Sequence, residues 1–89
     1  MNTAIILLNV KRKLVNDVAE QLAGMQEISE VYSVTGQYDL ICIVRVRDND
    51  VLANLMTDKI TTVKGITQSN TMLAFKAFSK HDLDSMFAI

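Results

Sequence analysis

The sequence has few of the residues from which small proteins build covalent or catalytic centres. Its 89 residues include one cysteine (Cys42), one histidine (His81) and no proline. One cysteine cannot close a disulfide within the chain or supply a cysteine-ligated metal site, which fits a reducing cytoplasm. No histidine, cysteine and carboxylate residues share the spacing of metal ligands, and no glycine loop has a phosphate-binding pattern. We therefore expect no metal and no cofactor.

The net charge and the shortness of the apolar runs exclude two classes of partner. Nine basic and ten acidic residues leave a net charge of −1, so the chain offers no electrostatic footprint for direct nucleic-acid binding. The apolar run at residues 5–8 is too short for a membrane span or the core of a signal peptide. We expect a soluble cytoplasmic protein that has no membrane partner.

The first part of the chain is typical of a strand followed by an amphipathic helix. Residues 3–10 form an apolar, β-branched run, and the basic residues 11–13 follow it. The helical stripe consists of Leu14, Val15, Val18, Ala19, Leu22 and Met25. Gly24 is the expected C-cap, and the basic residues oppose the helix dipole, so we expect a loose first turn.

The rest of the chain predicts a hairpin, a second helix and a last strand. β-rich runs at residues 28–34 and 40–46 flank the turn at Gly36. Residues 48–50 provide capping groups for a stripe of Val51, Leu52, Leu55, Met56, Ile60 and Val63, which Gly65 ends. Residues 66–78 form the last β-rich run, and residues 79–89 are expected to form a C-terminal arm or short helix.

This element order predicts an α+β fold of the ferredoxin-like βαββαβ type, with both helices on one face of an antiparallel sheet. However, both faces of the strands at 3–10 and 40–46 carry apolar residues: Ala4, Ile6, Leu8 and Val10 oppose Ile5 and Leu7, and Leu40, Cys42, Val44 and Val46 oppose Ile41 and Ile43. A sheet that has helices on one face only should alternate apolar and polar residues, so its second face needs a cover. A chain of this length buries only about 60–65% of its unfolded surface. We therefore expect a second copy to pack face to face on the sheet.

The most informative stretch is Val34-Thr35-Gly36-Gln37-Tyr38-Asp39-Leu40, which surrounds the hairpin turn. Glycine adopts positive φ there without steric cost. The Asp39 carboxylate can accept hydrogen bonds from nearby backbone amides, which would stabilise the turn, or from the ammonium group of a ligand. Spacing alone leaves both roles open.

The whole chain resembles the effector-binding RAM domain of the Lrp/AsnC transcription regulators, and specifically its stand-alone form. The resemblance depends on three stretches: residues 31–40, the Lys64-Gly65-Ile66 junction, and Thr67-Gln68-Ser69-Asn70-Thr71. Family members often have Pro-Gly before the last strand, and this chain keeps only the glycine. Because the first strand begins at about Thr3, we expect no helix-turn-helix, so the chain would not be a complete DNA-binding regulator.

The resemblance implies an assembly and a binding site. It implies a dimeric α/β barrel for residues 1–78, which assembles further into tetramers, octamers or rings and binds small effectors, commonly amino acids, where dimers meet. A full-length Lrp/AsnC-type regulator or a metabolic partner is then expected. The implied ligand-binding residues are Thr35, Gly36, Gln37, Tyr38, Asp39, Ser69 and Thr71. Hydroxyls and turn amides suit an α-carboxylate, and the aspartate suits an α-ammonium.

Two other functional classes remain as alternatives. One is a purely architectural module, which needs the dimer interface but no pocket. The other is a small ferredoxin-like dimeric enzyme of the monooxygenase type, which we disfavour because His81 lies on the tail and Cys42 lies within an apolar strand. We therefore predict a sensing domain that is not an enzyme.

Overall fold

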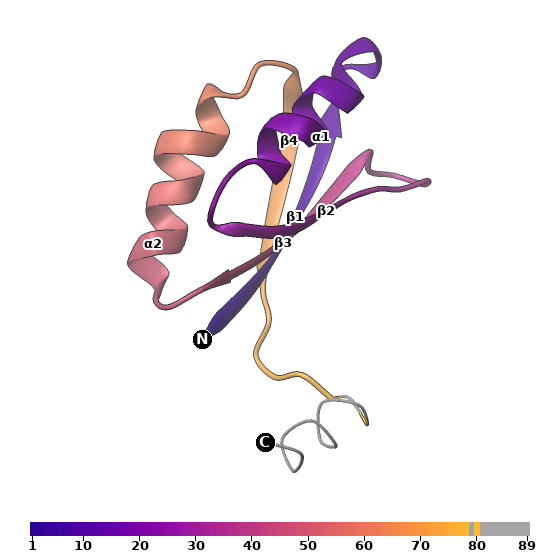
Figure 1. Cartoon of the computed structure of the whole chain (residues 1–89). Helices are drawn as coiled ribbons and strands as arrows, with labels where there is room; N and C mark the ends of the chain where they lie inside the picture. The colour runs from indigo at the N-terminus through magenta and orange to yellow at the C-terminus, as the bar shows by residue number, and fades with distance from the viewer. Residues whose placement is uncertain (79, 81–89) are drawn as a thin grey trace.

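The computed structural model describes residues 1–78 and 80, and it confirms the ferredoxin-like βαββαβ fold. Its sheet has the strand order β2-β3-β1-β4, and all neighbouring strands are antiparallel. Both helices lie on the same side of this sheet (Figure 1). The elements are β1 (Asn2–Val10), η1 (Arg12–Leu14), α1 (Val15–Ala23), β2 (Ile28–Ser33), β3 (Leu40–Val46), α2 (Asn49–Asn54), η2 (Leu55–Lys59), η3 (Ile60–Thr62) and β4 (Ile66–Leu73).

The hydrophobic core lies between the helices and the even-numbered residues of the two central strands. β1 contributes Ala4, Ile6, Leu8 and Val10, and β3 contributes Leu40, Cys42, Val44 and Val46. All eight are buried, and within each strand the four share one face, as the alternation predicts. The helices contribute Val18, Leu22, Leu52, Leu55 and Ile60, and Ile28 and Val63 complete the core.

The helix ends follow the predicted capping residues. The Asp48 side chain accepts a hydrogen bond from the Val51 amide at 3.0 Å and so caps α2, and Gly24 is the C-cap of α1. The basic residues before α1 form a 3₁₀ turn instead of a first α-helical turn. The second helix is less regular than its apolar stripe predicts, because η2 is a π-helical turn and η3 is a 3₁₀ turn. Leu55 and Ile60, five residues apart, are both buried across this π turn.

Gly65 is held tightly at the turn between the second helix and β4. Its φ is +104°, and its carbonyl accepts a hydrogen bond from the Lys11 amide at 2.8 Å. A Cβ atom at this position would lie 2.9 Å from Leu14 Cδ1. The position therefore requires glycine for both its backbone conformation and its packing.

We predict that Gly65→Ala lowers the free energy of unfolding by about 1–3 kcal/mol, because it adds positive-φ strain and a steric contact. The matched control is Gly24→Ala, since Gly24 has φ −79° and no atom closer than 3.5 Å to the added Cβ. This control should be neutral or stabilise the protein by about 0.4–1 kcal/mol. Chemical denaturation measures both, and equal stabilities of the two variants would contradict the prediction.

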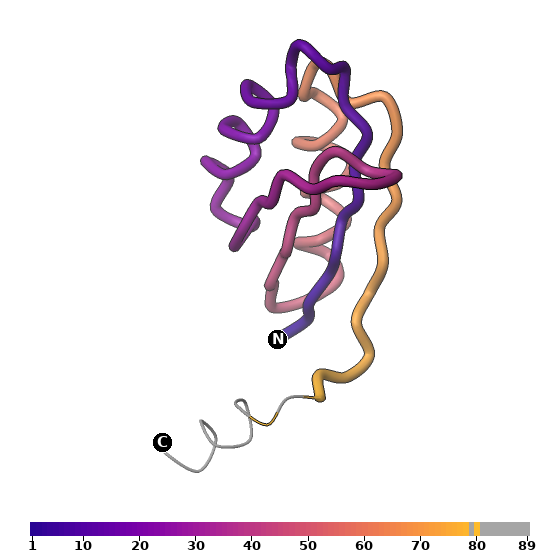
Figure 2. Tube along the Cα trace, turned by 90° about the vertical axis from the view of Figure 1, so that its right-hand side faces the viewer, coloured from indigo at the N-terminus to yellow at the C-terminus, as the bar shows by residue number. Residues whose placement is uncertain are grey.

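β4 is shorter than the sequence predicts: the β-rich run to Phe78 was expected to be one strand, but β4 ends at Leu73. The last hydrogen bond to β1 joins the Ala74 amide to the Thr3 carbonyl at 2.9 Å. Because β1 begins at Asn2, residues beyond Ala74 have no neighbouring strand. Residues 74–78, which we call the arm, leave the fold past the N-terminus (Figure 2). The arm or short helix expected at residues 79–89 lies outside the described residues, apart from Lys80.

Candidate functional site

The hairpin turn from Thr35 to Asp39 is anchored at one end and open at its tip. The Asp39 amide donates to the Leu8 carbonyl at 2.9 Å, and the Val34 amide donates to the Asp39 carbonyl at 3.1 Å. Gly36 has φ +111°, and a Cβ atom there would meet no atom within 4 Å. In the part of the chain that the structure describes, no backbone hydrogen bond uses the amides of residues 35–38. These amides are therefore free to receive an anionic group.

The Asp39 carboxylate has a structural role that uses one of its two oxygens. Its Oδ2 accepts a hydrogen bond from the Val10 amide at 2.8 Å. Val10 lies beyond Leu8, the last residue of β1 that pairs with β3, and its amide points to the same side as the Leu8 carbonyl. The side chain thus supplies the acceptor that a strand carbonyl would otherwise provide. Oδ1 makes no hydrogen bond within the described residues, so the turn-stabilising role is present and leaves one acceptor for a ligand.

Tyr38 connects the turn to the edge strand β4. The Asn70 side-chain amide donates to the Tyr38 hydroxyl at 3.4 Å. Asn70 pairs with Leu7 of β1, so both residues face the side of the sheet that has no helices. The sequence pattern indicated the hydroxyls on either side of Asn70, those of Ser69 and Thr71, but not Asn70 itself. The alternation of side chains along β4 was the signal that could have identified it.

Ser69 and Thr71 do not join the turn within one chain. They pair with Leu8 and Ile6, so their side chains lie on the helix side of the sheet, opposite to Asn70. The Thr71 hydroxyl lies 3.8 Å from the Met56 sulfur of η2. Ser69 instead borders a hollow of about 270 Å³ between the second helix and β4, which we call the β4 groove. Its lining residues are Met56, Ile60, Thr61, Val63, Ile66, Thr67, Gln68 and Ser69.

The second face of the sheet is apolar, as predicted. Ile5 pairs with Ile43 and Leu7 with Ile41, and all four side chains remain partly exposed on the face without helices. Tyr32 of β2 and Met72 of β4 extend this surface, with exposed fractions of 49% and 45%. We call these six residues the open face. In the described chain, nothing covers it.

A polar cluster borders the open face on β2 and β3. Glu30 accepts hydrogen bonds from the Tyr32 hydroxyl and, at 3.2 Å, from Arg45 Nη1. The hydroxyl and then the guanidinium hold the pKa of the Glu30 carboxyl below its ordinary value, and the same carboxyl raises the pKa of Tyr32. Because this cluster is exposed, salt weakens its electrostatic contribution to stability.

The residues considered for enzyme chemistry do not form a reactive centre in the described chain. Burial raises the pKa of the Cys42 thiol to about 11, so the thiol is protonated at neutral pH and is a poor nucleophile. Within residues 1–78 and 80, no three histidine, cysteine or carboxylate side chains lie close enough to hold a metal ion. His81 lies outside the described residues. The described helices include none of the length and hydrophobicity that a membrane crossing requires.

Comparison with known proteins relates the whole fold to one family. Residues 3–83 match the family model described as the Lrp/AsnC ligand binding domain. The HTH-type transcriptional regulator FL11 of Pyrococcus horikoshii is 37% identical over 73 residues, which cover 82% of this chain and 48% of the regulator. The chain thus spans about half the length of the curated relatives it matches.

Solved structures have the same architecture. The crystal structure of TTHA0845 from Thermus thermophilus has a TM-score of 0.84 at 36% identity, covering 90% of this chain and 100% of the other. The transcriptional regulator NMB0573 from Neisseria meningitidis, crystallised as a complex with L-Met, has a TM-score of 0.79 at 15% identity. That match covers 88% of this chain and 52% of the regulator, and it shows a likeness in fold.

Proposed function

Because this chain belongs to the Lrp/AsnC ligand binding domain family, we propose that it is a sensing domain whose effector is a free amino acid bound at the turn from Thr35 to Asp39. The observation that supports this site most directly is the combination of free amides at residues 35–38 with the unpaired Oδ1 of Asp39. The amides suit an α-carboxylate, and the carboxylate oxygen suits an α-ammonium. The L-Met complex of the related fold is consistent with this class of ligand.

Assembly is the second part of the proposal. The open face is the surface on which a second copy would pack, because it is apolar and central to the sheet. Ser69 and Thr71 lie on the other side of the sheet, so they can contact a ligand at the turn only if they come from another copy. We propose that the chain acts in the cytoplasm as a homo-oligomer and regulates a full-length regulator of the same family or a metabolic partner.

The test is a thermal-shift screen of the purified protein with each of the twenty common amino acids. At a concentration of about one hundred times its dissociation constant, a ligand that binds only the folded state adds about 2.7 kcal/mol of stability per site. For a domain of this size this raises the melting temperature by at least several degrees. If none of the amino acids changes the melting curve, the architectural role replaces the sensing role.

A further inference from the structure

The β4 groove is an apolar, uncharged hollow beside a free sheet edge. Met56, Ile60, Val63 and Ile66 are buried or partly buried and supply its apolar surface, while Thr61 and the β4 residues at its rim are exposed. The lining residues include no acidic or basic side chain. An aromatic or aliphatic side chain could therefore enter without displacing water from a charged group.

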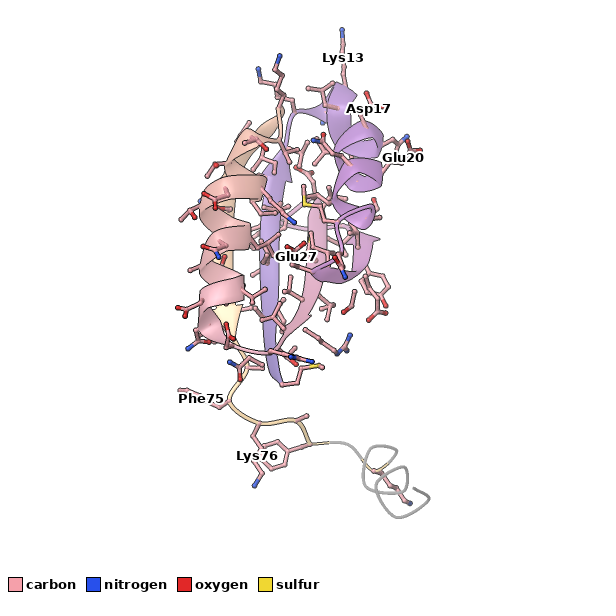
Figure 3. All side chains as sticks on the ribbon, turned by 60° about the vertical axis from the view of Figure 1, so that its left-hand side comes forward. Lys13, Asp17, Glu20, Glu27, Phe75 and Lys76 are labelled. Atoms are coloured by element: carbon pink, nitrogen blue, oxygen red, sulfur yellow. The ribbon has the colours of Figure 1, made fainter. Side chains whose placement is uncertain are left out.

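The arm presents an aromatic side chain that the described chain leaves uncovered. Phe75 has an exposed fraction of 105% and Phe78 one of 84%. Phe78 has the Lys76 ammonium 5.1 Å from the centre of its ring, whereas Phe75 projects away from the end of β4 (Figure 3). Exposed phenylalanine side chains on an extended segment are typical of anchors for a partner surface.

A chain cannot place Phe75 in its own groove. The groove adjoins β4 at residues 66–69, near the start of the strand, while the arm leaves the other end of the same strand. At about 3.3 Å per residue, Ser69 and Phe75 are separated by roughly 20 Å along this extended segment. The arm also continues away from the fold (Figures 1 and 2). An occupant from the arm must therefore belong to a second copy.

We propose that Phe75 of one copy docks in the β4 groove of a neighbouring copy. The two surfaces differ and lie at opposite ends of β4, so the contact joins copies either by reciprocal exchange of arms in a closed pair or head to tail into rings or longer assemblies. It is distinct from the symmetrical packing proposed for the open face, and it does not depend on the amino-acid effector.

Two exposed substitutions test the two sides of this contact. Phe75→Ser removes the anchor, and Thr61→Arg places a long charged side chain at the groove rim, near a helix C-terminus where a cation is favourable. The matched controls are Ala77→Ser in the arm and Thr62→Arg, an exposed neighbour that does not line the groove. The mass in solution is measured by size exclusion with light scattering over a range of concentrations.

Each test variant should weaken the higher assembly at least tenfold and leave the same smaller unit, while both controls keep the wild-type mass. A mixture of the two test variants should form a complex heavier than either alone, because one provides an intact groove and the other an intact arm. Wild-type mass in either test variant, or no association in the mixture, would overturn the proposal.

Two further measurements separate this contact from other occupants of the groove. Truncation after Phe78 should keep the wild-type number of subunits. If the truncated protein forms a smaller assembly and Phe75→Ser does not, the contact belongs to residues 79–89 and the proposal is overturned. The thermal response to an amino acid is also compared between Thr61→Arg and the wild-type protein. If Thr61→Arg abolishes that response and keeps the wild-type mass, the groove binds the effector and the proposal is wrong.

Discussion

Ile43→Asp is expected to convert the assembled protein into monomers or to unfold it. Ile43 lies at the centre of the open face, paired with Ile5 of β1 and with Glu30 of β2. An unpaired carboxylate buried between two packed sheets costs about 3–5 kcal/mol, and each 1.4 kcal/mol changes an association constant about tenfold. A symmetrical interface contains the substitution twice, so the loss of affinity should exceed a thousandfold.

Size exclusion with light scattering measures this effect directly, and circular dichroism distinguishes a folded monomer from an unfolded chain. Gln21→Glu is the control, because it adds one negative charge at an exposed position of α1. It should keep the wild-type mass. A wild-type mass near 9.9 kDa at micromolar concentration would contradict the dimer itself, and an unchanged mass in Ile43→Asp would show that the copies associate through another surface.

Much of the fold follows from patterns that are local in the sequence. The two-residue alternation in β1 and β3 predicted which side chains share a face, because each strand places successive residues on opposite faces, and the structure shows that the even-numbered set is the buried one. Asp48 caps α2 as expected, since an aspartate before a helical stripe meets the free amides of the first turn wherever the helix lies. The apolar odd-numbered residues likewise predicted the open face.

The features that were missed depend on contacts between distant segments. β4 ends where β1 begins, and nothing in the composition of residues 66–78 marks that point. The π turn η2 was missed because an apolar stripe does not show local changes in helical geometry. Asp39 bonds to an amide 29 residues earlier, so the turn alone could not show that one carboxylate oxygen is occupied. For the same reason, only the register of β4 shows that Ser69 and Thr71 lie apart from the turn.

Asp39→Asn is expected to keep the fold and to lose most of the response to the amino-acid effector. The asparagine oxygen can still accept the hydrogen bond from the Val10 amide, so the turn stays anchored. The side chain no longer carries the negative charge that we propose to bind the α-ammonium. Loss of a hydrogen bond to a charged group costs about 1.5–3 kcal/mol, which weakens binding by roughly tenfold to more than hundredfold. Thermal-shift titration with the amino acid that stabilises the wild-type protein most measures this loss.

Two further variants test whether the loss of ligand response comes from the Asp39 carboxylate at the turn. Asp39→Ala removes the acceptor as well as the charge, so it should also lower the free energy of unfolding by about 1–3 kcal/mol, because the Val10 amide is left without its partner. Glu20→Gln makes the same change of carboxylate to amide on the exposed surface of α1, beyond its first turn, and should keep both the stability and the ligand response. If Asp39→Asn binds the effector as tightly as the wild-type protein, the carboxylate serves only the turn. The ammonium group must then find its acceptor elsewhere, on this chain or on a neighbouring copy.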